Sequence, residues 1–129
     1  MINLISTIVC EDVLSNAAGR MTLYSIFRDL WADVYPAEVV RLHVVTTWFN
    51  TGPTPQTVMA RTVVLSDSQD LLGEAIFSFS VAPNAYHTQI SRFRSLIFPA
   101  PGIYRVQVQA GTDIVADLPF FLVAPKGEA

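Results

Sequence analysis

Paired carboxylates are the closest that this sequence comes to a set of reactive groups. Two carboxyl groups about 5 to 10 Å apart can hydrolyse a glycosidic bond, and clustered loop oxygens can bind calcium. Aspartate is also common in turns, because its side chain accepts hydrogen bonds from nearby backbone N–H groups. We expect this structural role, and no catalytic residues, for the pairs Glu11 with Asp12, Asp29 with Asp33, and Asp67 with Asp70.

The two histidines could hold a metal ion only if folding brought them together. His43 and His87 lie far apart in the chain, and neither belongs to an H-x-H, H-x-x-x-H or H-E-x-x-H motif. Spacings of that kind place two imidazoles side by side, where Zn²⁺ can bind both. The sequence therefore predicts hydrogen-bonded or exposed histidines, with no metal site and no cofactor.

No nucleophile has neighbours that would activate it. No serine lies in a G-x-S-x-G motif, and the only cysteine, Cys10, ends an apolar segment where a buried, unreactive thiol is expected. The glycines are isolated at turns, so the chain has no glycine-rich phosphate loop. A single cysteine also excludes an intrachain disulfide, which suits a reducing compartment. We predict a protein that is not an enzyme.

Aromatic side chains offer a different chemistry, the stacking or docking of a ligand. Trp31 and Tyr35 belong to an irregular segment, whereas Trp48, Phe49 and Tyr86 lie on expected strands. Together they could form a flat platform for sugar rings. Trp48 and Phe49 point to opposite faces of a strand, so one of them is expected in the core. For Trp31 and Tyr35 we expect a different role, in which they close one end of the fold.

The composition favours contact with another protein. Hydrophobic residues make up 51% of the 129 residues and charged residues only 15%, whereas about 25% charged residues is usual in soluble domains. So few charges are expected to leave apolar patches on the surface, and such patches usually mark an interface. The sequence therefore predicts a homo-oligomer or a protein partner.

Charge and hydropathy argue against nucleic acid and membrane. The net charge is −3 and the basic residues are scattered, so no stripe could follow a phosphate backbone. No segment reaches the roughly 18 apolar residues that a membrane span needs. The first residues also lack the basic start of a secretory signal. We expect a cytoplasmic protein.

Strands separated by turns are expected to position all of these residues. The expected strands have alternating or β-branched apolar residues and end at Gly, Pro, Asn or Asp. They cover residues 2–10, 21–27, 40–49, 58–66, 74–81, 86–98 and 103–110, followed by a last strand that ends at residue 123. This pattern predicts one domain, residues 1–129, built as an antiparallel β-sandwich of eight or nine strands with little helix.

Three segments carry more detailed expectations. Residues 11–20 should form a loop, and residues 28–39 a crossing segment with a short turn of helix near Pro36. Both faces of residues 21–27 are largely apolar, so both are expected to be covered.

The last strand is expected at the edge of a sheet. Pro119 has no N–H group to donate to a neighbouring strand. An edge is a natural place for a partner to dock. We therefore predict as contact residues Trp31, Tyr35, Phe120 and Phe121.

The segment Pro101-Gly102-Ile103-Tyr104-Arg105-Val106 resembles the start of strand F in immunoglobulin-like domains. In those domains a tyrosine hydrogen-bonds back to the preceding backbone, two residues before a core position. By this resemblance Tyr104 is the corner tyrosine, and Val106 stands where antibody domains place a cysteine. The resemblance implies that the sandwich is immunoglobulin-like.

Further phrases resemble a bacterial family of small all-β proteins, a domain of unknown function. They are Cys10-Glu11-Asp12, Leu23-Tyr24-Ser25-Ile26-Phe27, Tyr35 before Pro36-Ala37-Glu38, Leu42-His43-Val44-Val45-Thr46 and His87-Thr88-Gln89. This resemblance supports the fold and implies no activity. The sequence as a whole predicts a non-enzymatic protein-interaction or scaffold domain that acts through an apolar sheet face or edge. A small-molecule or carbohydrate-binding module is the alternative.

Overall fold

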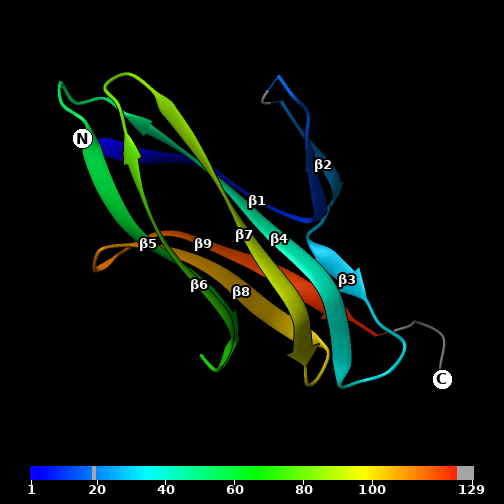
Figure 1. Cartoon of the computed structure of the whole chain (residues 1–129). Coiled ribbons are helices and arrows are strands. Elements are labelled where there is room, and N and C mark those ends of the chain that lie inside the picture. Colours follow the sequence, from blue (N-terminus) through cyan, green and yellow to red (C-terminus); the bar gives the residue numbers. More distant parts are fainter. Residues whose placement is uncertain (19, 125–129) are drawn as a thin grey trace.

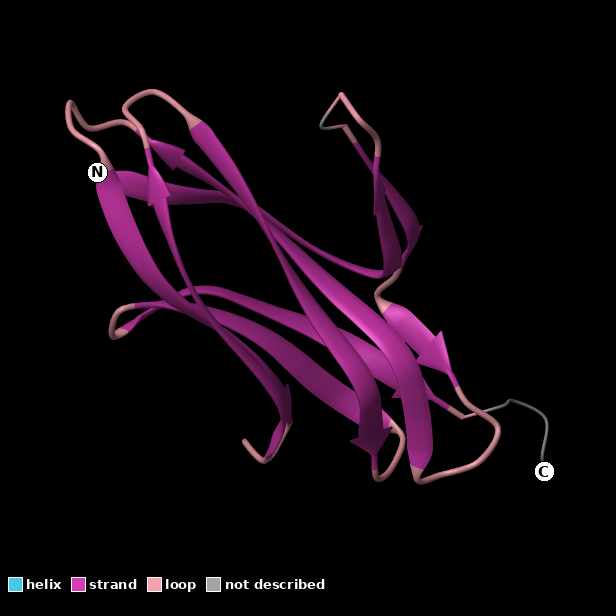
Figure 2. Ribbon diagram, viewed as in Figure 1, coloured by secondary structure: helices cyan, strands magenta, loops and turns pink. Residues whose placement is uncertain are grey.

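Nine strands and no helix make up the part of the chain that the computed structural model describes, residues 1–18 and 20–124. The expected all-β fold is thereby confirmed, and Figure 2 shows strands joined only by loops and turns. No helix formed by these residues has the length and apolar character needed to cross a bilayer. The strands are β1 (Ile2–Ser15), β2 (Met21–Ile26), β3 (Asp29–Trp31), β4 (Ala37–Asn50), β5 (Gln56–Ser66), β6 (Leu71–Val81), β7 (Tyr86–Phe98), β8 (Gly102–Ala110) and β9 (Asp113–Val123).

The strands form two sheets that face each other (Figure 1). One sheet has the order β2-β1-β4-β7, and the other has the order β3-β9-β8-β5-β6. Neighbouring strands are antiparallel except for β3, which runs parallel to β9. The expectation of a wholly antiparallel fold is therefore wrong at β3. The chain enters this short strand directly from the other sheet, so no hairpin sets its direction.

Alternating side chains fill the space between the two sheets. On β4, Leu42, Val44 and Trp48 are at most 1% exposed, and on β8 both Val106 and Val108 are completely buried. Branched and aromatic residues suit the pleated, half-buried surface of a strand. Burying one such side chain stabilises the fold by roughly 1.5–3 kcal/mol. The core thus follows the alternation that is visible in the sequence.

One member of the Trp48–Phe49 pair lies in the core, as expected. Trp48 is 1% exposed and packs against Phe79, with ring centroids 5.5 Å apart. Phe49 lies on the opposite face of β4 against the exposed ring of Tyr86, at a centroid distance of 4.6 Å. The burial of Trp48 removes it from any aromatic platform at the surface.

The Tyr104 hydroxyl makes the hydrogen bond expected of a corner tyrosine. It donates to the backbone carbonyl of Ala100 at 2.6 Å. The ring is 4% exposed and meets the edge of the Phe98 ring at a centroid distance of 4.7 Å. The hydrogen bond therefore ties the turn before β8 to a residue of the core.

β1 is longer than expected, and its end leaves the sandwich. Residues 11–15 were expected in a loop, but they pair with β2 as far as Ser15 opposite Met21. The last residue of β1 to pair with β4 is Cys10, opposite His43. Beyond it, the β1–β2 hairpin stands away from the body of the molecule, at the upper right of Figure 1. Residues 11–15 form a strand because they pair with β2, and their own sequence contains no sign of that pairing.

The β1–β2 hairpin is held by a small cluster of apolar side chains, which we call the hairpin cluster. It is separate from the clusters between the two sheets. The members come from both strands of the hairpin and from β4 and β7, so the sheet must curl to bring them together. They are Cys10, Val13, Met21, Leu23, Val45 and Ile90.

The short helical turn expected near Pro36 does not form. Ala37 and Glu38 already belong to β4, where they pair with Phe98 and Ile97 of β7. A single helical turn gains little, because nucleation fixes several residues for one hydrogen bond. Continuous pairing with β7 is the more stable arrangement. The peptide bond before Pro36 is cis.

Candidate functional site

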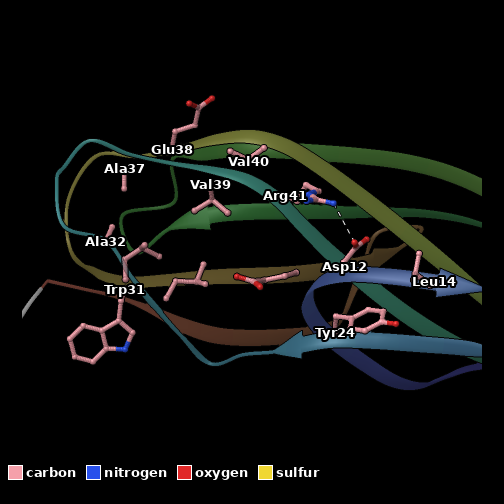
Figure 3. Close-up of a pocket in the computed structure, with 13 residues that line it drawn as sticks. Asp12, Leu14, Tyr24, Trp31, Ala32, Ala37, Glu38, Val39, Val40 and Arg41 are labelled. Atoms are coloured by element: carbon pink, nitrogen blue, oxygen red, sulfur yellow. Dashed lines mark hydrogen bonds and ion pairs between the residues drawn. The ribbon is translucent and has the colours of Figure 1, made fainter.

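A hollow of about 600 Å³ lies where the β1–β2 hairpin separates from β4 (Figure 3). We call it the hairpin groove. It is partly open to solvent, and its lining comes from β1, β2, β3, the residue after β3, the start of β4 and the end of β9. The lining residues are Glu11, Asp12, Leu14, Tyr24, Leu30, Trp31, Ala32, Ala37, Glu38, Val39, Val40, Arg41 and Leu122.

The hairpin groove is bordered by strands that lack a partner on one side. Within residues 37–42 of β4, all but Val40 pair with β7, and among the described residues no strand pairs with the other edge of this segment. In the same part of the chain, β3 pairs with β9 alone, and residues 11–15 pair with β2 alone. Unpaired edges present free backbone N–H and C=O groups, which another extended chain can use.

Exposed apolar side chains surround the groove. Trp31 and Val40 are each 63% exposed, Leu14 is 55% exposed and Tyr24 is 46% exposed. In Figure 3, Tyr24 and Trp31 lie on the side of β2 and β3, with Val39 and Val40 across from them on β4. Solvent-facing apolar groups that gather around one hollow are typical of an interaction surface.

The position of Tyr24 contradicts one expectation. Both faces of β2 were expected to be covered, but Tyr24 and Ile26 are 46% and 62% exposed. The reason is that β2 is the outermost strand of its sheet and stands on the hairpin. Within the described residues, no second layer covers the face of β2 that carries Tyr24 and Ile26.

The polar lining of the groove is acidic. Its ionisable residues are Glu11, Asp12, Glu38 and Arg41, so three carboxylates face one guanidinium. Arg41 Nη1 donates to Asp12 Oδ2 at 3.2 Å, across the gap where β1 and β4 part. Both side chains are solvent-accessible, at 63% and 37%, and such a pair contributes only about 0–1 kcal/mol to stability. The ion pair therefore adds little to the stability of the fold.

Tyr35 anchors the crossing segment. Its hydroxyl donates to the Val123 carbonyl at 3.1 Å, and its ring packs against the main core. Burial raises the pKa of the Tyr35 hydroxyl, and the nearby Tyr104 adds to this effect. The segment that carries Trp31 is thus tied to the end of β9 while Trp31 itself stays exposed.

The Phe120–Phe121 pair divides between core and surface. Phe120 is 2% exposed and packs against Phe98 and Tyr104, so a partner cannot reach it without disrupting the core. Phe121 is 40% exposed, and its N–H donates to the Arg28 carbonyl at 2.8 Å. Phe121 is therefore accessible as a contact residue, whereas Phe120 is not.

The edge predicted for β9 exists along part of the strand. Because Phe121 points its N–H toward β3, Pro119, two residues earlier, turns its nitrogen to the same side. The pairing with β3 begins only at Phe121. Pro119 therefore lies on the unpaired part of the β9 edge, where no donor is needed. From Phe121 onward, β3 pairs with this edge.

The two histidines have separate structural surroundings. His43 is 5% exposed, and its Nδ1 lies 2.9 Å from the Glu11 carbonyl, so the ring nitrogen donates. His87 stacks on Phe79 at a centroid distance of 4.1 Å, with its Nε2 3.1 Å from Gln89 Oε1. In the described ranges no three His, Cys, Asp or Glu side chains come close enough together to hold a metal ion.

Cys10 and Asp70 have structural contacts. The Cys10 side chain is fully buried, its Sγ lies 3.5 Å from the Asp12 carbonyl, and burial raises the pKa of the thiol. A buried, protonated thiol is a poor nucleophile. Asp70 closes the turn between β5 and β6, where its N–H donates to Ser66 Oγ at 3.0 Å and its Oδ2 accepts from Ser68 Oγ at 3.3 Å.

Most of the groove could not be recognised from the sequence. The sequence marks Trp31 as a contact residue, whereas Tyr24 and Val40 look like ordinary strand residues. The one available signal was the second apolar face of residues 21–27, which pointed to burial and proved to be exposed. The lining comes from five strands, and their approach depends on pairing between distant segments.

Two solved structures show where the same fold occurs. One is the Pseudomonas fluorescens alkylpurine DNA glycosylase AlkC bound to DNA containing an abasic site analog, at 14% identity and a TM-score of 0.61 over 95% of this chain. The other is the β-D-glucoside glucohydrolase from Trichoderma reesei, at 15% identity and a TM-score of 0.59 over 95% of this chain. The matched region spans only 30% and 19% of those chains. At such identities the likeness concerns the fold alone.

Sequence comparison identifies a family. Curated proteins give no match. A family model described as "Family of unknown function (DUF6941)" matches residues 5–123, which is nearly the whole chain. The resemblance found in the sequence to a family of unknown function is thus confirmed. The chain belongs to the family of unknown function DUF6941.

Proposed function

We propose that this protein is a non-enzymatic protein-interaction domain and that the hairpin groove is its docking site. The observation that carries the proposal is the gathering of exposed apolar side chains around unpaired strand edges. A polypeptide can use both features at once, because it brings apolar side chains and backbone hydrogen-bonding groups together. The low charge content of the chain supports the same function.

We further propose that the sandwich is immunoglobulin-like. Two features support this assignment. The order β1-β4-β7 opposite β9-β8-β5-β6 follows strands A, B and E opposite G, F, C and C′. Tyr104 makes the corner hydrogen bond at the start of the strand that would be F. The β1–β2 hairpin and β3 are then additions to that framework, and the groove lies among them.

The compartment and the assembly belong to the same proposal. A lone cysteine, buried in the structure, supports a cytoplasmic location. The exposed apolar side chains favour either self-association or a different protein partner. Sedimentation velocity over a wide range of protein concentration distinguishes these two, because only self-association makes the sedimentation coefficient rise with concentration.

Site-specific photocrosslinking tests the docking site. A photoreactive phenylalanine analogue replaces Trp31 in one variant and Tyr86 in a control. The two native side chains are similarly exposed, at 63% and 68%, but Tyr86 lies on β7 outside the groove. We expect one defined protein adduct from position 31, identified by mass spectrometry, and none of that protein from position 86. The purified partner should then bind the Trp31→Ala variant at least about tenfold more weakly. The same adducts from both positions, or none from position 31, would contradict the proposal.

Carbohydrate or small-molecule binding is the second candidate. Trp31 and Tyr24 place two aromatic rings at a hollow of about 600 Å³, within the roughly 300–1,000 Å³ of ligand pockets. Sugars that stack on Trp31 should change its fluorescence, while the buried Trp48 gives a constant background. A titration with oligosaccharides that leaves the emission of the protein unchanged eliminates this candidate.

A further inference from the structure

The chemistry of the hairpin groove indicates what kind of polypeptide it binds, provided that the groove is the docking site proposed above. We propose that the ligand is an extended peptide that adds a strand to the free edge of β4 at residues 37–42 and carries at least one lysine or arginine. Three observations lead to this assignment: the free edge, the occupied backbone groups of β1, and the side chains around the edge.

The free edge has the length of a short strand. Within residues 37–42 of β4, all but Val40 pair with β7 on one side, and β1 joins the other side at His43. At about 3.3 Å per residue, these six positions extend over about 20 Å. Backbone N–H and C=O groups along such an edge require partners, and an added peptide strand supplies them better than water when the site is partly apolar.

Side chains occupy two backbone groups of β1 that could otherwise pair along this edge. The Glu11 carbonyl accepts a hydrogen bond from the buried His43 ring, with Nδ1 2.9 Å away. The next residue, Asp12, is tied to Arg41 and to its own neighbour, because Asp12 Oδ1 accepts from the Val13 N–H at 2.8 Å. Val13 is in turn buried in the hairpin cluster. The Glu11 carbonyl and the Val13 N–H are therefore already hydrogen-bonded to side chains, and they are not free to pair with the backbone of β4.

Side chains around the edge suit a strand with alternating apolar residues. Successive residues of an added strand point to opposite sides. One side meets the half-buried Leu30 and Val39, which already pack on the core. The other side lies beside the exposed Glu38 and Val40 of β4, which alternate with Val39. Apolar residues at alternate positions of the peptide can thus be covered by the groove.

Charge selects a basic peptide. Three carboxylates and one guanidinium in the lining leave a net charge of −2 (1 − 3), and the whole chain carries −3. Charge complementarity raises the association rate and rejects partners of like charge. A second copy of this acidic chain is for that reason a poorer occupant than a peptide with a lysine or arginine. Glu38 projects outward at the rim in Figure 3, where a basic side chain can reach it.

Synthetic peptides test strand addition directly. The probes are capped hexapeptides in which Val, Ile or Phe alternate with Lys, Ser or Glu, measured by Trp fluorescence and by amide chemical shifts in ¹⁵N-labelled protein. We expect the lysine peptides to bind, with the largest shifts at residues 37–42. Alternate peptide amides can be N-methylated at either the odd or the even positions. Only one of these two sets should weaken binding, by at least about tenfold, because only one edge of the added strand faces β4.

Charge reversal tests the preference for a basic residue. In the Glu38→Lys variant the lysine peptides should bind at least about tenfold more weakly and the glutamate peptides more tightly. Asp113→Lys changes the net charge equally at an exposed position next to the β8–β9 turn, outside the groove, and should leave both affinities unchanged. An equal effect of both variants would show that only the overall charge matters.

The outcomes separate this inference from the docking function. If position 31 crosslinks a defined protein but none of the peptides binds, or if N-methylated peptides bind as well as their parents, strand addition is wrong and the docking site remains. If the peptides shift amides outside residues 37–42 and the adjoining groove, strand addition is also wrong. If position 31 crosslinks only a second copy of the chain, the basic peptide is the wrong occupant.

Discussion

Tyr104 joins a turn to the core through one hydrogen bond, so its hydroxyl can be tested separately from its ring. We predict that Tyr104→Phe lowers the free energy of unfolding by about 1–2 kcal/mol, because the ring stays packed while the Ala100 carbonyl loses its partner. The melting temperature should fall by about 3–6 °C. Tyr24→Phe removes a hydroxyl from an exposed tyrosine and should change stability by less than about 0.5 kcal/mol. Equal losses in the two variants would contradict a specific role for the Tyr104 bond.

Cys10 makes the stability of the protein sensitive to alkaline pH. Burial raises the pKa of the folded thiol, so the unfolded chain loses this proton first. The stabilisation is complete below the thiol pKa of the unfolded chain, about 8.5, and is lost as the pH rises toward the folded pKa. We predict that the free energy of unfolding in urea decreases from pH 7.5 to pH 9.5.

The Cys10→Ala variant provides the control for this pH effect. Its stability should be lower at neutral pH, because a buried atom is lost, but should decrease less between pH 7.5 and 9.5. Tyr35 also has a raised pKa, but its titration belongs to a higher pH range, since free tyrosine titrates near pH 10. An identical slope in wild type and variant would show that Cys10 is not responsible.

Trp31 illustrates what can be predicted about a site from sequence. Its place in an irregular segment marked it as a possible contact, and it is exposed at the hairpin groove. The edge expected at Pro119 marks Phe120 as a contact residue, but Phe120 is buried. A proline indicates which backbone group lacks a partner, but it does not indicate which of the next two side chains faces the core.

At Gly73, β6 lies directly against side chains of the opposite sheet. A Cβ atom added there would lie 2.7 Å from Leu96 Cδ2 and 3.0 Å from Phe93 Cδ1. Both neighbours are buried side chains of β7 with little room to move. We predict that Gly73→Ala destabilises the protein by about 1–3 kcal/mol. Ser78→Ala, at an exposed position of the same strand, should stay within about 0.5 kcal/mol in the same urea titration.

The β1–β2 hairpin should depend on its apolar cluster more than on its ion pair. Val13 is 7% exposed in the hairpin cluster, and Val13→Ala should cost roughly 2 kcal/mol. Arg41→Ala removes only the exposed contact to Asp12 and should cost less than about 1 kcal/mol. Hydrogen exchange should accelerate in residues 11–15 and 21–26 of the valine variant. A larger effect of the arginine variant would show that the ion pair holds the hairpin.

Strands were predictable wherever a local period continued through the whole element. The period-2 alternation of β8 and β9 is visible in the sequence, and so is the apolar run of β4. Residues 11–15 were missed because Glu11 and Asp12 are typical of loops, and only pairing with β2 makes them a strand. The start of β4 was missed for a similar reason, since Pro36 suggested a helical turn and β7 imposed a strand.

For the whole molecule, few charges and exposed apolar side chains predict association near the isoelectric point. The net charge of −3 at pH 7 decreases toward zero near the pI of about 5.1, and repulsion between copies then disappears. Light scattering should therefore be greatest near pH 5. Val40→Lys in the groove should reduce it more than Ile114→Lys outside, although both side chains are exposed and both variants change the charge equally. Equal reductions would indicate that association does not involve the groove.

The sequence by itself determined the all-β class, most of the strands and the alternation of β8, while the hydrogen bond of Tyr104 was implied by the resemblance to immunoglobulin-like domains. The class, the strands and the alternation depend on neighbours a few residues away, so alternation and turn residues are sufficient to reveal them. Only the tertiary structure decided where β1 leaves β4, that β3 runs parallel to β9, and that Trp31 is exposed while Phe120 is buried. Each of these depends on which distant segments pair. The hairpin groove exists because three segments there lack a partner on one side, namely residues 37–42 of β4, β3, and residues 11–15 of β1.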